Sequence, residues 1–383
     1  MTATKTYDAA VIGAGVFGAW TAWHLAKRGQ RVLLLDAYGP AHSRASSGGE
    51  SRIIRMGYGA DELYTRWSQR SLVQWKELFA AISQPLFHET GVLWLARNGP
   101  REKQTVDTLQ RCAVPHRVLK QAELTQRYPQ INCEGVEFAI FEPESGVLLA
   151  RRAVAAVVAD AIRRGAEYHL AQVAAPVASG APQEIKTAAG DTILANKIVF
   201  ACGAWLGKLF PEILGPRIFP TRQEVFFFAT PPGDARFAPP ALPTWLFQED
   251  QVYGMPDLES RGLKIAFDHH GERVDPDTQS RFASPKAAEE ARRYVAHRFP
   301  ALRDAPIAES RVCQYENTSS GDFLVDHHPE LTHVWFAGGG SGHGFKHGPA
   351  MGEYVASQML EEAAAEPRFL LATKESIQRR AVY

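Results

Sequence analysis

The chain has 383 residues, of which 45% are hydrophobic and 22% charged, as is usual for a globular protein. Lys plus Arg and Asp plus Glu balance at 42 each, so no basic field exists and nucleic acid is not an expected partner. No stretch approaches the roughly 18 apolar residues that span a bilayer. The first apolar strand begins so early that we expect no signal peptide and no membrane association.

The cysteines carry no metal-binding pattern. The chain has four of them, Cys112, Cys133, Cys202 and Cys313. They are scattered and do not show the spacing of metal ligands. We therefore expect a cytoplasmic protein with free thiols and no bound metal.

Residues 8–36 follow the pattern of a dinucleotide-binding unit: an apolar strand, GxGxxG, a helix and a second strand ending in an acid. Gly13 makes the tight turn, Gly15 lets the backbone approach a pyrophosphate, and Gly18 lets the helix pack closely on the strand. The helix N-terminus favours phosphate, and Asp36 can hold ribose hydroxyls. The unit predicts dinucleotide binding but does not choose between NAD and FAD.

The next segment, residues 43–55, favours FAD. It reads SRASSGGESRIIR, whereas a plain NAD-binding domain would continue into an ordinary crossover. Small residues such as Ser46 and Ser47 suit a backbone that lies against a cofactor. Arg52 and Arg55 suit an anion.

A glycine-rich joint lies near the C-terminus. Residues 338–348 read GGGSGHGFKHG, between an apolar strand at 334–337 and a helical run at 350–356. A flexible loop is one interpretation. The alternative is a backbone without Cβ atoms that lies flat against a large ring.

Together these segments resemble the amine-oxidising flavoproteins of the D-amino-acid-oxidase-like superfamily, most closely the monomeric sarcosine oxidase and N-methyltryptophan oxidase family. The resemblance covers nearly the whole chain. Besides the segments above, it rests on IVFACGAW at 198–205, on the GLKIAF and DPD phrases within 253–277, and on 311–348.

The resemblance implies an α/β fold of two interleaved domains. A Rossmann-like FAD-binding domain is interleaved with a mixed β-sheet substrate domain, in a monomer or small homo-oligomer. The FAD-binding domain is expected to use residues 1–85, 146–215 and 306–383, and the substrate domain residues 86–145 and 216–305.

The resemblance also implies that FAD is joined covalently to the sulfur of Cys313. A thiolate is the nucleophile in such a reaction, and a nearby cation favours it. Arg311 is the candidate for that cation. The residues expected to contact FAD are Gly13, Gly15, Gly18, Asp36, Ser46, Ser47, Arg52, Val173, Cys313, Gly340, Gly342, Gly344 and Lys346.

Lys264 and Arg52 are the implied catalytic residues. On strand pattern alone, Lys264 could point to solvent. In the family it resembles, the matching lysine lies over the flavin and serves oxygen reduction, since a cation stabilises superoxide. Arg52 is expected against the flavin face or on the pyrophosphate side.

The implied substrate contacts complete the site. Arg55 and Lys346 are expected to clamp the substrate carboxylate. Tyr253 and Tyr315 are expected to form pocket walls, and the carbonyl of Gly342 is expected to face the substrate amine.

Two places depart from the family pattern. Sarcosine oxidases have a histidine pair before the RIIR phrase, where this chain has Ser47 and Gly48. Sarcosine oxidases have a histidine four residues after the lysine that matches Lys264, and this chain has Asp268 there. Two interpretations stay open. Either Asp268 contacts the substrate, which would suit a basic or hydroxylated amine, or Asp268 faces away and His269 or His270 takes the place of the histidine.

The implied reaction is the oxidation of a small amino acid or N-alkylated amine. A hydride moves to flavin N5 and leaves an imine, and oxygen then reoxidises the flavin and forms hydrogen peroxide. No strong protein base is evident, and direct hydride transfer needs none. The alternatives are an oxidase of a cyclic or primary amino acid or of a fructosyl amino acid, a flavin dehydrogenase, or a subunit of a heteromeric oxidase.

Overall fold

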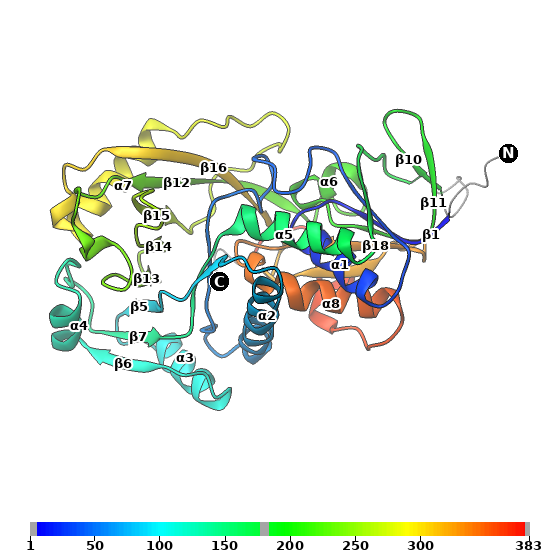
Figure 1. The fold of residues 1–383 in the computed structure, drawn as a ribbon. Helices are drawn as coiled ribbons and strands as arrows, with labels where there is room; N and C mark the ends of the chain where they lie inside the picture. The colour runs from blue at the N-terminus through cyan, green and yellow to red at the C-terminus, as the bar shows by residue number, and fades with distance from the viewer. Residues whose placement is uncertain (1–5, 177–183, 380–383) are drawn as a thin grey trace.

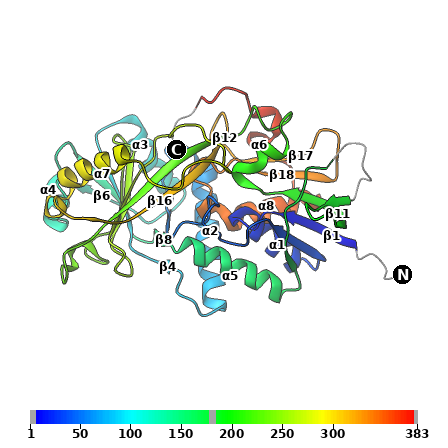
Figure 2. The ribbon, with the colours of Figure 1, turned by 90° about the horizontal axis from the view of Figure 1, so that it is seen from above.

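The structure is a computed structural model, and it describes residues 6–176 and 184–379. Two large sheets lie side by side along the long axis of the molecule (Figure 1). The first sheet lies on the right of Figure 1 and the second on the left. Seen from above in Figure 2, β12 and β16 extend from the second sheet toward the first.

The first sheet has seven strands in the order β17-β18-β11-β1-β2-β9, with β10 paired to β11. Its strands are β1 (Thr6–Ile12), β2 (Val32–Asp36), β9 (Glu167–Leu170), β10 (Glu184–Lys186), β11 (Thr192–Phe200), β17 (Leu324–His327) and β18 (Val334–Gly338). The pairings of β1 with β2 and β11, of β2 with β9 and of β11 with β18 are parallel. This is the predicted Rossmann-like sheet.

Helices cover this sheet and bury its apolar residues. They are α1 (Val16–Lys27), α2 (Glu62–Ala81), α5 (Ala150–Arg163) and α8 (Gly348–Met359). α1 connects β1 to β2 and packs against both α5 and α8. It is buried along almost its whole length, because the sheet, α5 and α8 surround it.

The second sheet has eight strands in the order β16-β12-β15-β14-β13-β5-β7-β6. Its strands are β5 (Val92–Ala96), β6 (Arg117–Lys120), β7 (Phe138–Glu142), β12 (Phe219–Phe228), β13 (Thr244–Phe247), β14 (Val252–Met255), β15 (Leu263–Phe267) and β16 (Ile307–Asn317). Only the pairing of β5 with β13 is parallel among the described pairs of this sheet. The sheet is therefore mixed, as predicted.

Shorter elements complete the fold. A three-stranded sheet consists of β3 (Arg52–Ile54), β8 (Gly146–Leu148) and β4 (Phe87–His88). The remaining helices are α3 (Pro100–Arg111), α4 (Gln121–Arg127), α6 (Leu206–Leu209), α7 (Pro285–Arg298), η1 (Gly203–Trp205), η2 (Ala235–Phe237), η3 (Pro300–Leu302), η4 (Phe345–His347), η5 (Pro367–Phe369) and η6 (Leu371–Thr373).

The interleaving of the chain is visible in the order of the strands. β5 to β7 enter the second sheet between two groups of strands of the first sheet, and β12 to β16 do so again. β16 falls in the segment that the sequence assigns to the FAD-binding domain, yet it is hydrogen-bonded along its whole length to β12 of the second sheet. The exact domain boundaries stay a prediction.

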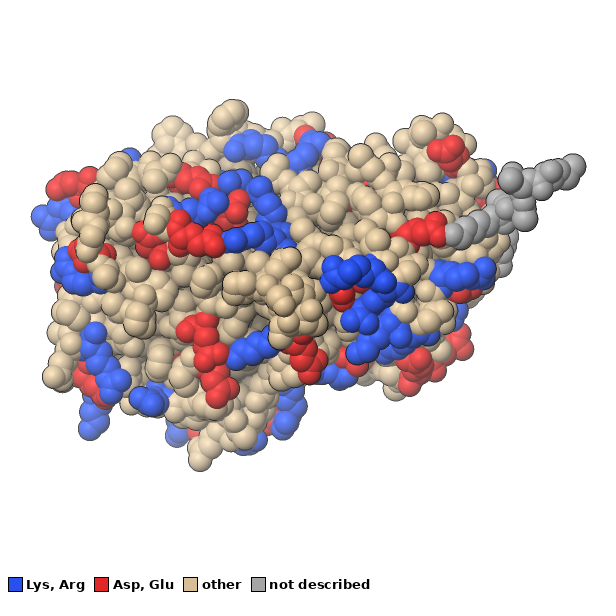
Figure 3. All heavy atoms as spheres, in the orientation of Figure 1, with Lys and Arg blue, Asp and Glu red and all other residues tan. Residues whose placement is uncertain are grey.

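Charges of both signs are mixed on the surface. On the face drawn in Figure 3, Lys and Arg side chains lie among Asp and Glu side chains, in keeping with the balanced composition. None of the helices in the described residues has the length and apolar character that crossing a bilayer requires.

The contact between α1 and α8 leads to a first prediction. A Cβ atom at Gly352 would lie 2.4 Å from the backbone carbon of Trp20, so Gly352→Ala should push the two helices apart although alanine favours helix. Overpacking of this kind costs about 1–3 kcal/mol, and for a chain of this length we expect the thermal unfolding midpoint to fall by about 1–4 °C.

Gly207→Ala is the matched control, because its Cβ would meet only ordinary contacts, the nearest at 3.5 Å. An unchanged midpoint for Gly352→Ala would contradict the backbone contact between α1 and α8.

Candidate functional site

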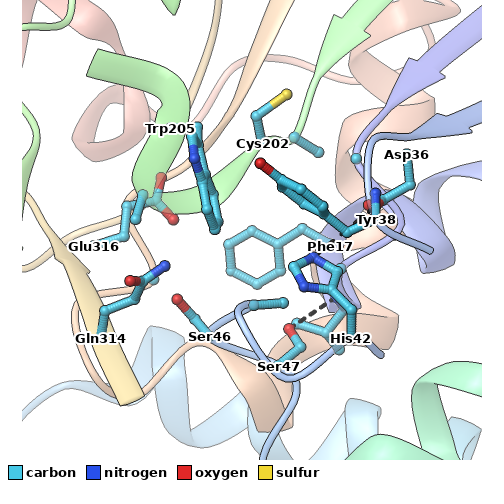
Figure 4. Close-up of a pocket in the computed structure, with 18 of the residues that line it drawn as sticks. Phe17, Asp36, Tyr38, His42, Ser46, Ser47, Cys202, Trp205, Gln314 and Glu316 are labelled. Atoms are coloured by element: carbon cyan, nitrogen blue, oxygen red, sulfur yellow. Dashed lines mark hydrogen bonds and ion pairs between the residues drawn. The ribbon is translucent and has the colours of Figure 1, made fainter. Parts of the chain in front are cut away.

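A long cavity opens at the carboxyl ends of β1, β2, β11 and β18, where α/β proteins bind their ligands. Its wall combines segments that are far apart in the sequence. Figure 4 shows part of this wall, with Phe17, Asp36, Ser46, Ser47 and Glu316 among the labelled residues. Those of the predicted cofactor residues that line it are Gly13, Gly15, Asp36, Ser46, Ser47, Arg52, Val173, Cys313, Gly340, Gly342 and Gly344.

Gly18 and Lys346 are the two predicted cofactor residues outside this wall. Gly18 lies behind the loop, and a Cβ there would be 1.8 Å from the carbonyl oxygen of Gly13. Gly13 has φ +105°, and a Cβ on it would be 2.4 Å from the carbonyl oxygen of Ala201. The turn therefore lies directly against β11 and α1, in the roles that the motif predicts for these two glycines. Lys346 lines the second cavity, described below.

Asp36 fixes the loops at the end of β1 and β2. Its Oδ2 accepts a hydrogen bond of 2.7 Å from the backbone N–H of Ala14. Its Oδ1 accepts from the N–H groups of Tyr38 and Gly39 at 2.8 and 2.9 Å. The carboxylate thus positions the glycine loop while it also faces the cavity.

The serines of the 43–55 loop lie beside the first turn of α1. Ser47 Oγ accepts a hydrogen bond of 3.1 Å from the N–H of Val16. Ser46 Oγ is buried and has no hydrogen-bond partner among the described residues. Buried polar atoms are rarely left unpaired, so Ser46 is suited to a ligand in the cavity.

Arg52 is the cation beside Cys313. Its Nη2 donates to Cys313 Sγ at 3.3 Å and to the carbonyl oxygen of Ser46 at 2.8 Å. Arg311, the cation proposed from the sequence, instead pairs with Glu50 at 3.1 Å and with Glu309. Two carboxylates thus hold the Arg311 guanidinium, so the sequence assignment was wrong.

Glu316 is a cavity residue that the sequence did not indicate. It is 7% exposed, and its Oε1 accepts the N–H of Gly339 at 2.8 Å. Burial raises the pKa of this carboxyl group to about 7, against the lowering effect of that hydrogen bond. Nothing in the alternation of β16 distinguishes Glu316 from a surface acid.

The residues of the cavity fit FAD. At one end, the glycine turn and the N-terminus of α1 provide the close approach that a pyrophosphate needs. At the other end, Cys313, Gly342 and Gly344 line the wall. A Cβ at Gly342 would lie 2.7 Å from the Tyr315 ring, so this wall has no room for a side chain there.

A second, smaller cavity continues from the first. The two share Arg52, Tyr315, Gly342 and Phe345. The other polar residues of the second cavity are Arg55, Gln248, Gln251, Tyr253, Asp268, His270, Ser341, His343 and Lys346. The structure therefore brings together all six residues that the sequence predicts to contact the substrate.

Arg55 is held between two aromatic rings. Its guanidinium carbon lies 4.6 Å from the ring centres of both Tyr58 and Trp94, and it donates to the carbonyl oxygen of Gly57. Such stacking orients a buried guanidinium and compensates part of its desolvation.

Lys346 lies in the short helix η4 and is 4% exposed. Its Nζ donates to the hydroxyl of Tyr58 at 2.7 Å and to the carbonyl oxygen of His343 at 2.8 Å. Burial, with the nearby charge of Arg55, lowers the pKa of this lysine well below its usual range. His343 anchors the loop, since its Nε2 lies 3.1 Å from the carbonyl oxygen of Gly321.

Lys264 does not point to solvent. Leu263 and Ile265 enter the core of the second sheet, while Lys264 projects from the opposite face and is 2% exposed. Its Nζ donates to the carbonyl oxygen and to Oγ of Ser51, at 2.9 and 3.2 Å. Burial, with the charge of Arg52, lowers the pKa of this lysine well below its usual range.

Asp268 faces the second cavity. Its Oδ1 accepts a hydrogen bond of 2.8 Å from the hydroxyl of Tyr315. Burial raises the pKa of Asp268, although the Tyr315 hydrogen bond and the nearby charges oppose this. His270 also lines the cavity, whereas His269 is exposed. The interpretation in which Asp268 faces away is therefore wrong.

Two positioning residues were missed by sequence reasoning. Tyr58 contacts both Arg55 and Lys346. Glu142 is 1% exposed and accepts four hydrogen bonds: from the N–H groups of Met56 (2.7 Å) and Gly57 (3.0 Å), from Trp94 Nε1 (2.7 Å) and from Ser145 Oγ (2.6 Å). Their partners are distant in the sequence, so no local pattern reveals them.

The fold and the two joined cavities define a flavin-dependent oxidoreductase. The chain belongs to the DAO family of FAD dependent oxidoreductases, whose sequence model matches residues 8–358. Within the described residues, no group of three or more His, Cys, Asp or Glu side chains is arranged to hold a metal ion.

Relatives cover almost the whole chain. It is 32% identical to the monomeric sarcosine oxidase of Bacillus sp. (strain NS-129), over 91% of this chain and 92% of that protein. It is also 32% identical to the human peroxisomal sarcosine oxidase, over 91% of each chain. The N-methyl-L-tryptophan oxidase of Yersinia pestis is 28% identical, over 91% of this chain and 94% of that protein.

Solved structures share the fold. The L-proline dehydrogenase of P. horikoshii superposes with a TM-score of 0.82 at 22% identity, over 95% of this chain and 96% of that chain. The glycine oxidase of Geobacillus kaustophilus gives a TM-score of 0.80 at 22% identity, over 96% and 99% of the two chains. At this identity the likeness concerns the fold alone.

The contacts of Glu142 lead to a second prediction. In Glu142→Gln an amide NH₂ replaces one of the two acceptor oxygens, so buried donors around Gly57 lose their partner. An unsatisfied buried group costs about 1–3 kcal/mol, and Arg55 should lose its fixed position. We expect a lower thermal midpoint and weaker binding of a small carboxylate, read from the flavin absorbance spectrum.

Glu144→Gln, at an exposed position two residues away, is the matched control for this change. Equal behaviour of the two variants would show that Glu142 does not position Arg55.

Proposed function

We propose that the protein is an FAD-dependent oxidase of small amino acids, with N-alkylated (secondary) amino acids as the first candidates. The observation that carries this proposal is a small pocket containing two buried cations, Arg55 and Lys346, which opens directly onto the cofactor cavity. The sarcosine oxidases and the N-methyl-L-tryptophan oxidase named above support this choice of substrate class.

Arg55 and Lys346 bind the substrate carboxylate in this proposal. Arg55 offers paired donors and Lys346 a point charge, and both are fixed by Tyr58. Tyr253 and Tyr315 form the walls, and the carbonyl of Gly342 accepts from the substrate nitrogen. The α-carbon is then oriented toward the cofactor cavity, and the walls exclude water.

FAD held along the cavity by the glycine turn, Asp36 and Cys313 would supply the redox chemistry, as an acceptor for a hydride equivalent from the α-carbon and a donor of two electrons to oxygen, with an imine and hydrogen peroxide as products. Arg52 and Lys264 provide positive charge beside the cofactor cavity, which favours reduction of oxygen to an anion. Lys264 and Arg52 both donate to the carbonyl oxygen of Ser51, and Arg52 lines that cavity, in support of this role.

The covalent link through Cys313 is part of the proposal. Cys313 lines the cofactor cavity, and Arg52 donates a hydrogen bond to its sulfur, in support of this link. Cytoplasmic location, a monomeric or small homo-oligomeric state and the domain boundaries given above stay predictions.

A substrate panel tests the proposed function. Under anaerobic conditions we expect sarcosine or another N-alkyl amino acid to bleach the flavin, and air to restore the colour within seconds with formation of hydrogen peroxide. Bleaching by cyclic, primary or fructosyl amino acids alone would favour those alternatives, and slow recolouring in air would favour a dehydrogenase. If none of these amines bleaches the flavin, the chain does not act alone as an amine oxidase.

Acid precipitation of the holoprotein tests the covalent link. We expect the yellow colour in the pellet for the wild type and in the supernatant for Cys313→Ala, because that variant lacks the sulfur. Cys112→Ala is the control, since Cys112 is not among the residues that line the cavity, and the pellet of this variant should stay yellow. Colour in the wild-type supernatant would rule out the link.

A further inference from the structure

The second cavity contains one carboxylate among the described residues that line it, and this is Asp268. It stands where the family pattern has a histidine, and no part of the proposed function above requires it. A carboxylate is unexpected in this pocket, because Arg55 and Lys346 are placed there to attract the carboxylate of a ligand.

The geometry orients one oxygen of Asp268 and leaves the other for a ligand. Oδ1 accepts the hydroxyl of Tyr315 at 2.8 Å. The backbone N–H of Asp268 donates to the carbonyl oxygen of Gln251 at 2.7 Å, which fixes the segment after β15. Within the described residues no hydrogen bond reaches Oδ2, and Asp268 lines the cavity, so we take Oδ2 as the oxygen that meets a bound molecule.

The charges around Asp268 come from several elements. Positive charge comes from β3 and the residues that follow it and from η4, and phenolic hydroxyls come from β14 and β16. The titratable and charged groups that face Asp268 or share its cavity are Arg52, Arg55, Tyr253, His269, His270, Tyr315, His343 and Lys346. The cations attract the carboxylate of a ligand, and the Asp268 carboxylate can accept from its ammonium group. The pocket therefore complements a zwitterion.

We propose that Asp268 is a catalytic residue that accepts the ammonium proton of a zwitterionic amino acid. The inference rests on the proposed function and deepens it, because it names the bound form of the substrate. That form carries a carboxylate and a protonated primary or secondary amine with at least one N–H bond.

The proton balance is simple. The bond between nitrogen and its proton breaks, the proton joins Asp268 Oδ2, and the electron pair stays on nitrogen. The substrate then has the free lone pair that loss of hydride from the α-carbon requires, and Asp268 is a neutral carboxylic acid. Burial raises the pKa of Asp268, which favours the protonated form. The nearby cations repel the positive charge of the substrate ammonium group and so favour its loss of a proton.

The sequence indicated no strong protein base, and Asp268 is the residue that takes this role. A position that the family pattern fills with histidine here holds a carboxylate, and only the structure shows that it faces the pocket. The expected preference is for zwitterions over isosteric carboxylates that lack a protonated amine.

Binding to the photoreduced holoenzyme tests the proposal, because reduced enzyme can bind an amino acid without oxidising it. The probes are sarcosine, which is zwitterionic, and methoxyacetate, which has the same shape and no ammonium group. Calorimetry at pH 8 in buffers of different ionisation enthalpy counts the protons that leave the complex. Infrared difference spectra show whether a protonated carboxyl group forms. The variants are Asp268→Asn and the control Glu289→Gln, which is exposed on α7.

For the wild type and Glu289→Gln, we expect sarcosine to bind more tightly than methoxyacetate, with no proton released and with a new carboxylic acid band. For Asp268→Asn, we expect about one proton released per sarcosine, no such band, and about tenfold or greater loss of sarcosine affinity. In the same variant, the affinity for methoxyacetate should either rise or fall by a smaller factor than the affinity for sarcosine.

Three results would overturn the proposal: proton release by the wild type equal to that of Asp268→Asn, absence of the carboxylic acid band, or tighter binding of methoxyacetate than of sarcosine to the wild type. Flavin content and thermal midpoint show whether Asp268→Asn is folded. Failure of the proposed function is seen separately, as a flavin that no amino acid bleaches in the substrate panel.

Discussion

The whole site depends on keeping four cationic side chains out of bulk water. Arg52, Arg55, Lys264 and Lys346 gather around two joined cavities, and each donates to at least one backbone carbonyl oxygen. Burying an unpaired charge costs free energy, so the cations can be buried only where the backbone holds these carbonyl oxygens in position. The loop around 43–58, which supplies most of these carbonyls, is therefore as important to the site as the charged side chains themselves.

That requirement explains the dense support around the loop. Glu142 accepts the N–H groups of Met56 and Gly57, Tyr58 stacks on Arg55, and Trp94 closes the other side. Depressed lysine pKa values follow from the same burial. A bound carboxylate would offset the positive charge of Arg55 and Lys346, which is a physical reason for the pocket to prefer anionic groups.

Sequence reasoning reached the features that local chemistry determines. The roles of Gly13 and Asp36 could be predicted because all parts of their motif lie within one βαβ unit. The role of the glycines near 340 could be predicted because a backbone without Cβ atoms permits close approach of a ligand. It could not determine which guanidinium lies beside Cys313, because Arg52 comes from a strand that is 261 residues away along the chain. The same holds for the direction of Asp268, which depends on the loop after β15, and for Glu142 and Tyr58, whose partners are set by tertiary packing alone.

The two sheets divide the work of the site between them. The glycine turn and Asp36 belong to the first sheet, whereas Tyr253 and Asp268 belong to or follow strands of the second. Substitutions in the loop after β15 can therefore alter which amine is accepted while the flavin anchors stay untouched. The second sheet is therefore the natural target for redesign. Gene duplicates with this fold could diverge in substrate specificity through changes in the second sheet, while the residues that bind the cofactor stay the same.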